Sequence, residues 1–122
     1  MESIIKKRAY DFALVCLNIG LKIQKSQKEF LLTKQFIKSS TSIGANICEA
    51  NSGESIKDFL HKMKVAMKEA VETRYWCSLL IDSGFLSEVE DKKILDEADV
   101  IIRIIGKIIS TTRKKIKEEA TQ

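Results

Sequence analysis

Polar side chains recur along the middle of the chain at spacings that would place them on facing helices. Seven residues form this set: Gln35, Ser42, Asn46, Glu49, His61, Glu69 and Glu72. If the two segments that carry them form a hairpin about Gly53, Asn46 lies opposite His61 and Gln35 lies opposite Glu72. Such a set could perform acid–base chemistry, but the same pairs would also satisfy polar groups at a helix interface. With one histidine in the chain, we predict a structural polar network and no catalytic residue.

The residue types that hold metals and phosphates do not occur in the required patterns. A di-iron bundle needs two Glu-x-x-His repeats, and His61 is the only histidine. The cysteines, Cys16, Cys48 and Cys77, are far apart and form no Cys-x-x-Cys pair, so neither a zinc site nor a disulfide framework is predicted. The chain also lacks the Gly-x-x-x-x-Gly-Lys phosphate loop. We therefore expect no metal and no cofactor, and a reducing, cytoplasmic environment.

Positive charge is concentrated towards the two ends of the chain. The net charge of +4 divides into +5 over residues 1–48, −4 over residues 49–91 and +3 over residues 92–122. The candidate nucleic-acid-binding residues are Lys6, Lys7, Arg8, Arg113, Lys114, Lys115 and Lys117. In an antiparallel bundle the first helix starts where the fourth ends, so the two groups are expected to converge. The alternative is an ordinary solvated face; in an oligomer, however, the patch would repeat as a ring that attracts polyanions.

The elements that position these residues are predicted to be four long helices. The chain contains no proline, where about 5% is usual, and five glycines. Three Ser-x-x-Glu/Asp capping boxes predict helix starts: Ser26 with Glu29, Ser55 with Asp58, and Ser87 with Glu90. Gly53 and Gly84 precede the last two boxes and suit left-handed helix ends. We predict one all-α domain over residues 1–122, an antiparallel up-down-up-down four-helix bundle with helices near 4–24, 27–51, 56–83 and 88–118.

The first predicted helix is apolar on two faces. Beside the stripe that contains Phe12 and Cys16, a second line forms about 130° round the helix, comprising Tyr10, Leu14, Leu17 and Leu21. Because no helix of a four-helix bundle is central, this second line predicts self-association; the alternative is a broad core with some exposed aliphatic surface. No uncharged run is longer than that of residues 12–21, which is shorter than the roughly 20 residues that cross a bilayer, so no membrane span is expected.

Several of these residues fall in a pattern that resembles the 23S rRNA-intervening-sequence proteins. The resemblance rests on Gln35, on Ser42-Ile43-Gly44-Ala45-Asn46-Ile47-Cys48-Glu49-Ala50, and on Lys68-Glu69-Ala70 followed by Glu72 and Tyr75-Trp76. It covers roughly residues 9–112. It implies a bacterial, left-handed four-helix bundle that assembles as a homopentamer around a central channel and has no known enzymatic activity. A similar protein, the accessory variability determinant of diversity-generating retroelements, is a basic pentamer that binds nucleic acid and a reverse transcriptase.

The chain departs from this pattern in its second helix. Gly44 stands where relatives often have proline, and Ala50 stands where they have glycine, so we predict a helix that bends less than theirs. The sequence thus favours a non-enzymatic oligomer that binds nucleic-acid backbone through a basic ring, since no sequence-reading motif is present. The alternative is a protein–protein scaffold or adaptor with no nucleic-acid role. A membrane partner is not expected.

Overall fold

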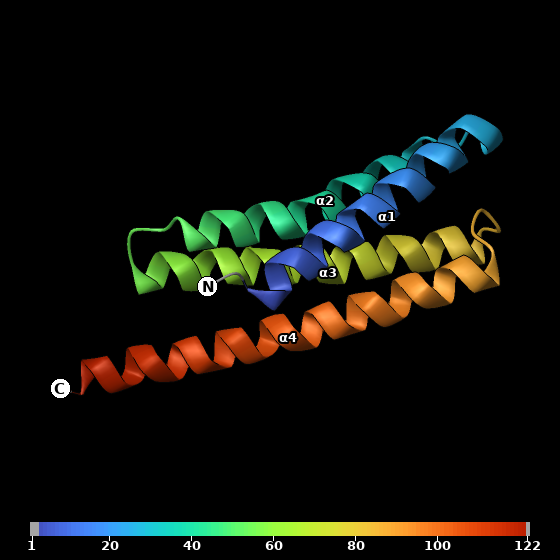
Figure 1. The fold of residues 1–122 in the computed structure, drawn as a ribbon. Helices are drawn as coiled ribbons and strands as arrows, with labels where there is room; N and C mark the ends of the chain where they lie inside the picture. Colours follow the sequence, from blue (N-terminus) through green and yellow to red (C-terminus); the bar gives the residue numbers. More distant parts are fainter. Residues whose placement is uncertain (1–2, 122) are drawn as a thin grey trace.

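The protein is an antiparallel bundle of four helices. The computed structural model describes residues 3–121, apart from the side chains of Glu88, Glu90 and Asp91. Its elements are α1 (Ile4–Gln27), α2 (Leu31–Asn51), α3 (Ile56–Asp82) and α4 (Glu88–Ala120), and consecutive helices run in opposite directions (Figure 1). Within the described residues there is no strand, so the predicted all-α, four-helix class is confirmed. None of the described helices carries an apolar run sufficient to span a bilayer.

Side-chain caps set most of the helix starts. The Ser55 hydroxyl accepts the backbone N–H of Asp58 at 3.1 Å, as its capping box predicted. The cap predicted at Ser26 is wrong, because the Ser26 hydroxyl donates to the Lys22 carbonyl at 2.8 Å and remains part of α1. The carboxylate of Glu29 caps α2 instead. The third box cannot be compared, since its acid, Glu90, lies outside the described side chains.

Left-handed residues end two of the helices. Gly84 has φ +83°, which confirms the predicted glycine after α3. The end of α1 uses Lys28, with φ 56°, and its N–H donates to the Gln24 carbonyl at 3.1 Å. Gly53 was predicted to adopt the same conformation, but among residues 3–121 only Lys28 and Gly84 have positive φ, so that prediction is wrong. The α2–α3 turn therefore needs no left-handed residue.

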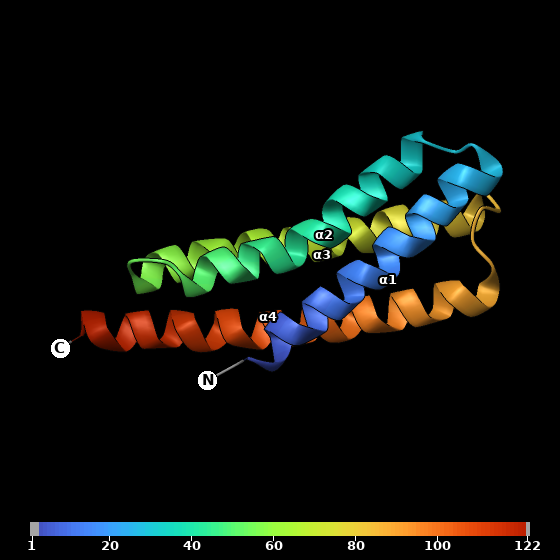
Figure 2. The ribbon, with the colours of Figure 1, turned by 45° about the horizontal axis from the view of Figure 1, so that its top comes forward.

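α2 bends near its middle (Figure 2). Four consecutive hydroxyl residues lie in this part of the helix, and each donates to a carbonyl three or four positions earlier: Ser39, Ser40, Thr41 and Ser42. Such back-bonding competes with the amide donors of the helix and tends to bend it. The bend therefore forms without the proline that relatives often have in this helix.

The core is built by all four helices, with α1 laid across α2. Buried side chains of α2, α3 and α4 include Phe36, Ile43, Met63, Leu80 and Ile101. α1 adds Ile5, Phe12 and Ile23 to this core, but its contact with α4 is the thinnest in the bundle. In Figures 1 and 2, α1 is inclined to α4 and meets it only towards its own N-terminus. The bundle is consequently open on its α1–α4 side.

Candidate nucleic-acid interface and the surrounding grooves

The C-terminal end of α4 presents four exposed cations. Within five residues it carries Arg113, Lys114, Lys115 and Lys117, all of them exposed. Cations at this end of a helix interact favourably with its dipole. The segment lies at the same end of the bundle as the α2–α3 turn (Figure 1). Glu118 and Glu119 follow directly and offset part of the charge. This end of α4 is the most strongly basic helix end in the described chain.

Two of the three basic residues at the start of α1 are paired with acids. Lys7 Nζ donates to Asp11 Oδ2 at 2.9 Å, one turn further along α1. Arg8 forms a two-bond ion pair with Glu97 of α4, with Nε to Oε2 at 2.8 Å and Nη2 to Oε1 at 3.0 Å. The Glu97 carboxylate raises the pKa of the Arg8 guanidinium through this hydrogen bond. Lys6 is half-buried. These three residues therefore present less unneutralised charge than the sequence suggested.

The two basic groups do not converge. Because Arg8 contacts Glu97, the start of α1 lies beside the first half of α4. Arg113 is sixteen residues further along the same helix, which is about 24 Å at 1.5 Å per residue. α4 thus continues well past α1 (Figure 1). The expectation of one seven-residue patch is wrong for a single chain; the structure gives a basic helix end and a separate, ion-paired group.

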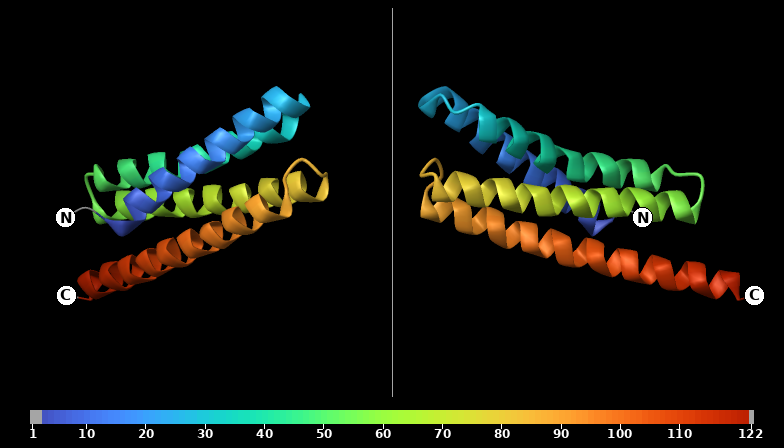
Figure 3. Two further views of the ribbon diagram at one scale, coloured as in Figure 1. Left: turned by 45° about the vertical axis from the view of Figure 1, so that its right-hand side comes forward. Right: turned by 180° about the vertical axis from the view of Figure 1, so that it is seen from behind.

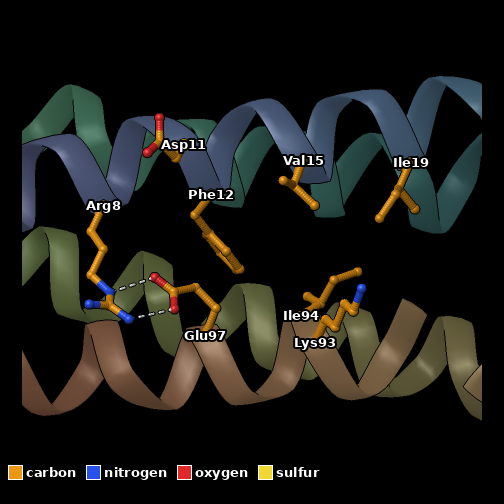
Figure 4. Close-up of a pocket in the computed structure, with 8 residues that line it drawn as sticks. All are labelled: Arg8, Asp11, Phe12, Val15, Ile19, Lys93, Ile94 and Glu97. Carbon is orange, nitrogen blue, oxygen red and sulfur yellow. Dashed lines mark hydrogen bonds and ion pairs between the residues drawn. The ribbon is translucent and has the colours of Figure 1, made fainter. Parts of the chain in front are cut away.

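The open side of the bundle contains an apolar groove of about 460 Å³ between α1 and α4. Figure 4 shows Phe12, Val15 and Ile19 of α1 facing Ile94 and the Lys93 stem of α4. The Arg8–Glu97 pair bridges the two helices at one end of the groove. Both acids of the lining are paired, Asp11 with Lys7 and Glu97 with Arg8. The groove therefore suits an apolar group and offers no unpaired acid for acid–base chemistry.

A second groove, of about 640 Å³, lies between α1 and α2. Its lining includes Tyr10 and the small residues Ala13, Gly44 and Ala45. Tyr10 is 63% exposed, and Leu14 and Leu21 on the same line are also exposed. The predicted second apolar line of α1 is thus on the surface of the single chain, where a partner could cover it.

Cys48 is exposed in this groove, whereas Cys16 is buried and its burial raises the thiol pKa to about 12.

The predicted polar network separates into local contacts. Ser42 donates to the Lys38 carbonyl and Asn46 donates to the Ser42 carbonyl, both within α2. Glu49 pairs with Lys62 of α3 at 3.1 Å. His61 is exposed. The Asn46 amide therefore donates within its own helix and not to His61, the partner that was predicted for it.

The opposition of Gln35 and Glu72 is present. Both line a polar cavity of about 230 Å³ between α2 and α3, together with Glu69. Partial burial, followed by the adjacent Glu72 carboxylate, raises the pKa of Glu69, against the opposing charges of Lys68 and Lys38. The sequence patterns did not predict the buried bond at this cavity, in which the Thr73 hydroxyl donates to Ser39 Oγ at 2.9 Å. The only sign of this bond in the sequence is that both facing positions, Ser39 and Thr73, carry a hydroxyl group.

In the described part of the chain, no group of three or more His, Cys, Asp or Glu side chains is placed to hold a metal ion. Several ionisable residues there form ion pairs or helix caps, whereas Glu69 lies partly buried beside Glu72. The fold and its sites define a small all-α bundle protein with one basic helix end and exposed apolar grooves.

Comparison with known proteins assigns this bundle to a family. The model of the family described as 23S rRNA-intervening sequence protein matches residues 1–107, so the chain belongs to that family. A crystal structure of a protein of unknown function from the S23 ribosomal protein family of Bacteroides thetaiotaomicron is 37% identical. The superposition covers 87% of this chain and 98% of the other, with a TM-score of 0.85. Among curated proteins none matches. The resemblance seen in the sequence is thereby confirmed for the family, whose function is unknown.

Proposed function

We propose that the protein is a non-enzymatic, self-associating bundle of the bacterial cytoplasm that binds nucleic-acid backbone without reading sequence. The observation that carries the proposal is the end of α4, where four exposed cations occur within five residues, Arg113, Lys114, Lys115 and Lys117. Phosphate contacts by lysine and arginine supply most non-specific affinity for nucleic acids and make it dependent on salt. Repetition of this helix end in an oligomer would add the contributions of several subunits.

Self-association is supported by two unlike apolar surfaces. One is the α1 line with Tyr10 and Leu14, and the other is on α3, where Val71 and Tyr75 are 51% and 58% exposed. Contact between two different surfaces is heterologous and closes into a ring when the rotation permits it. A ring of this kind agrees with the homopentamer that the family resemblance implies. We propose that the α1 line of one subunit meets the α3 surface of the next.

The rival function is a protein scaffold, for example for a reverse transcriptase. The 640 Å³ groove between α1 and α2 favours it, because the small residues in its lining let a partner helix approach closely. In that case purified protein would be free of nucleic acid. The groove would then be open to the partner, so the α1 line would not be covered by the next subunit as proposed above.

The test is a gel shift with RNA, combined with light scattering on the size-exclusion peak. Reversing two charges, Lys114→Glu with Lys115→Glu, is expected to weaken RNA binding and to flatten its dependence on salt. A matched control is Lys57→Glu with Lys64→Glu, two exposed lysines of α3. A nucleic-acid-free monomer, or an unchanged gel shift after the α4 reversal, contradicts the proposal.

A further inference from the structure

The turn between α1 and α2 holds an exposed aromatic side chain. The sequence predicted a helix from residue 27, which would have placed Phe30 inside its first turn. In the structure α1 ends at Gln27 and α2 begins at Leu31, so Phe30 is the N-cap residue of α2 and its side chain is 56% exposed. Its neighbour Leu31 is 77% exposed. The turn forms an outer corner of the bundle (Figures 1 and 3).

The same turn lies in a part of the chain where basic residues greatly outnumber acids. Residues 12–48 contain five lysines and a single acid, Glu29. Four of the lysines flank the turn, and all four are exposed: Lys22, Lys25, Lys28 and Lys34. The Glu29 carboxylate accepts the N–H groups of Leu32 and Thr33, each at 2.8 Å, and these bonds outweigh partial burial to hold its pKa below the ordinary value. This acid is directed at the start of α2, so the lysines remain available for an external anion.

We propose that this corner, which we call the Phe30 turn and define by Phe30 and the four flanking lysines, binds single-stranded nucleic acid. A base stacks on the exposed Phe30 ring while the lysines contact backbone phosphates. An exposed aromatic ring beside a basic track is the arrangement that binds single strands without regard to sequence. In a duplex the base faces are already stacked, so the ring selects single strands. This inference rests on the proposed nucleic-acid function and adds the class of ligand and a second contact.

Charge on the neighbouring turn favours a strand over a lipid surface. The Gln27 side chain donates to the Phe85 carbonyl at 3.0 Å, which joins the α1–α2 turn to the α3–α4 turn. The sequence over residues 82–91 contains four acids and no basic residue. A planar anionic membrane resting on this corner would meet both turns, whereas a flexible strand can follow the lysines of α1 and α2 alone. Single-stranded nucleic acid is therefore the better electrostatic match.

The experiment measures fluorescence anisotropy of a labelled oligothymidylate and of a duplex of equal length, with the full-length chain. Phe30→Ala is expected to weaken single-strand binding roughly 5-fold or more, and Phe30→Trp to retain it. Leu31→Ala is the matched control, because it removes exposed apolar surface from the same turn without a ring face. Lys28→Gln is expected to lower the slope of log affinity against log salt by roughly 0.7. Circular dichroism confirms that each variant is folded.

The outcomes separate this inference from the proposed function. If Phe30→Ala binds like the wild type while the α4 charge reversal weakens binding, the Phe30 turn is excluded and the proposed function stands. If Phe30→Ala weakens binding and the α4 reversal does not, the α4 site is excluded and the turn stands. Absence of any binding by the wild type overturns both. The lipid alternative is tested by flotation with phosphatidylcholine–phosphatidylserine vesicles. If the wild type floats with the vesicles and Phe30→Ala and Leu31→Ala abolish flotation equally, the turn binds lipid and the inference is overturned.

Discussion

The closest approach of α1 to α2 predicts opposite effects for two glycine-to-alanine substitutions. A Cβ atom at Gly20 would lie 2.6 Å from Ile37 Cγ1 and 2.7 Å from Ile37 Cδ1, both too close for carbon atoms. A Cβ atom at Gly44 would lie 3.7 Å from Ala9 Cβ, which is ordinary contact. Alanine gains about 1 kcal/mol over glycine inside a helix, whereas overpacking costs about 1–3 kcal/mol.

The expected changes in the free energy of unfolding follow from these terms. Gly44→Ala should stabilise the protein by about 0.5–1 kcal/mol, and Gly20→Ala should destabilise it by about 1 kcal/mol, within a range of about 0–2 kcal/mol. Urea unfolding followed by far-UV circular dichroism measures both. Combining Gly20→Ala with Ile37→Ala removes the clash, so a double-mutant cycle should give a coupling of about 1–2 kcal/mol. Equal stabilisation by both glycine substitutions, or no coupling to Ile37, refutes the close approach.

Two further predictions concern single carboxylates. Glu29→Ala should lower the free energy of unfolding by about 1 kcal/mol because it uncaps α2, whereas Ser26→Ala should change it by less than about 0.5 kcal/mol. A larger loss for Ser26→Ala in urea melts would restore the original capping box. Because the pKa of Glu69 is raised in the folded state, its ionisation makes folding less favourable as the pH rises from its ordinary pKa of 4.5 towards neutrality. Glu69→Gln should therefore stabilise the protein increasingly over that pH range. The control, Glu118→Gln at the exposed end of α4, should not. If the difference in unfolding free energy between Glu69→Gln and the wild type does not change with pH, the prediction is contradicted.

The helices were predictable because their signals are local. Apolar spacing and the Ser55 cap act within one or two turns, and they fix α3 to within a residue of the predicted bounds. The first connection was not predictable by the same rule. Ser26 has two uses for its hydroxyl, and the structure uses it to extend α1, while the Glu29 carboxylate alone caps α2. A capping-box pattern does not distinguish these two outcomes.

The arrangement of the basic residues depends on the inclination of α1 to α4, which no local sequence pattern contains. The two groups were predicted to converge because antiparallel helices share their ends. That rule assumes helices of similar length that stay parallel, but α1 has 24 residues and α4 has 33, and α1 is inclined to α4 (Figure 1). Because Arg8 contacts Glu97, the basic residues at the start of α1 do not reach the end of α4. Helix inclination comes from packing across the whole core, so only the structure reveals it.

The bend of α2 connects this packing to the surface features. Hydroxyl back-bonding from Ser39 to Ser42 supplies a cause that requires no proline. α1 packs on the N-terminal half of α2 through Gly20 and Ile37, so it follows the direction of that half. Figure 2 shows both segments diverging from α4 towards the α1–α2 turn. That divergence accounts for the 460 Å³ groove and for the position of Phe30 at an outer corner. The 460 Å³ groove and the position of Phe30 therefore both trace back to the hydroxyl run of α2.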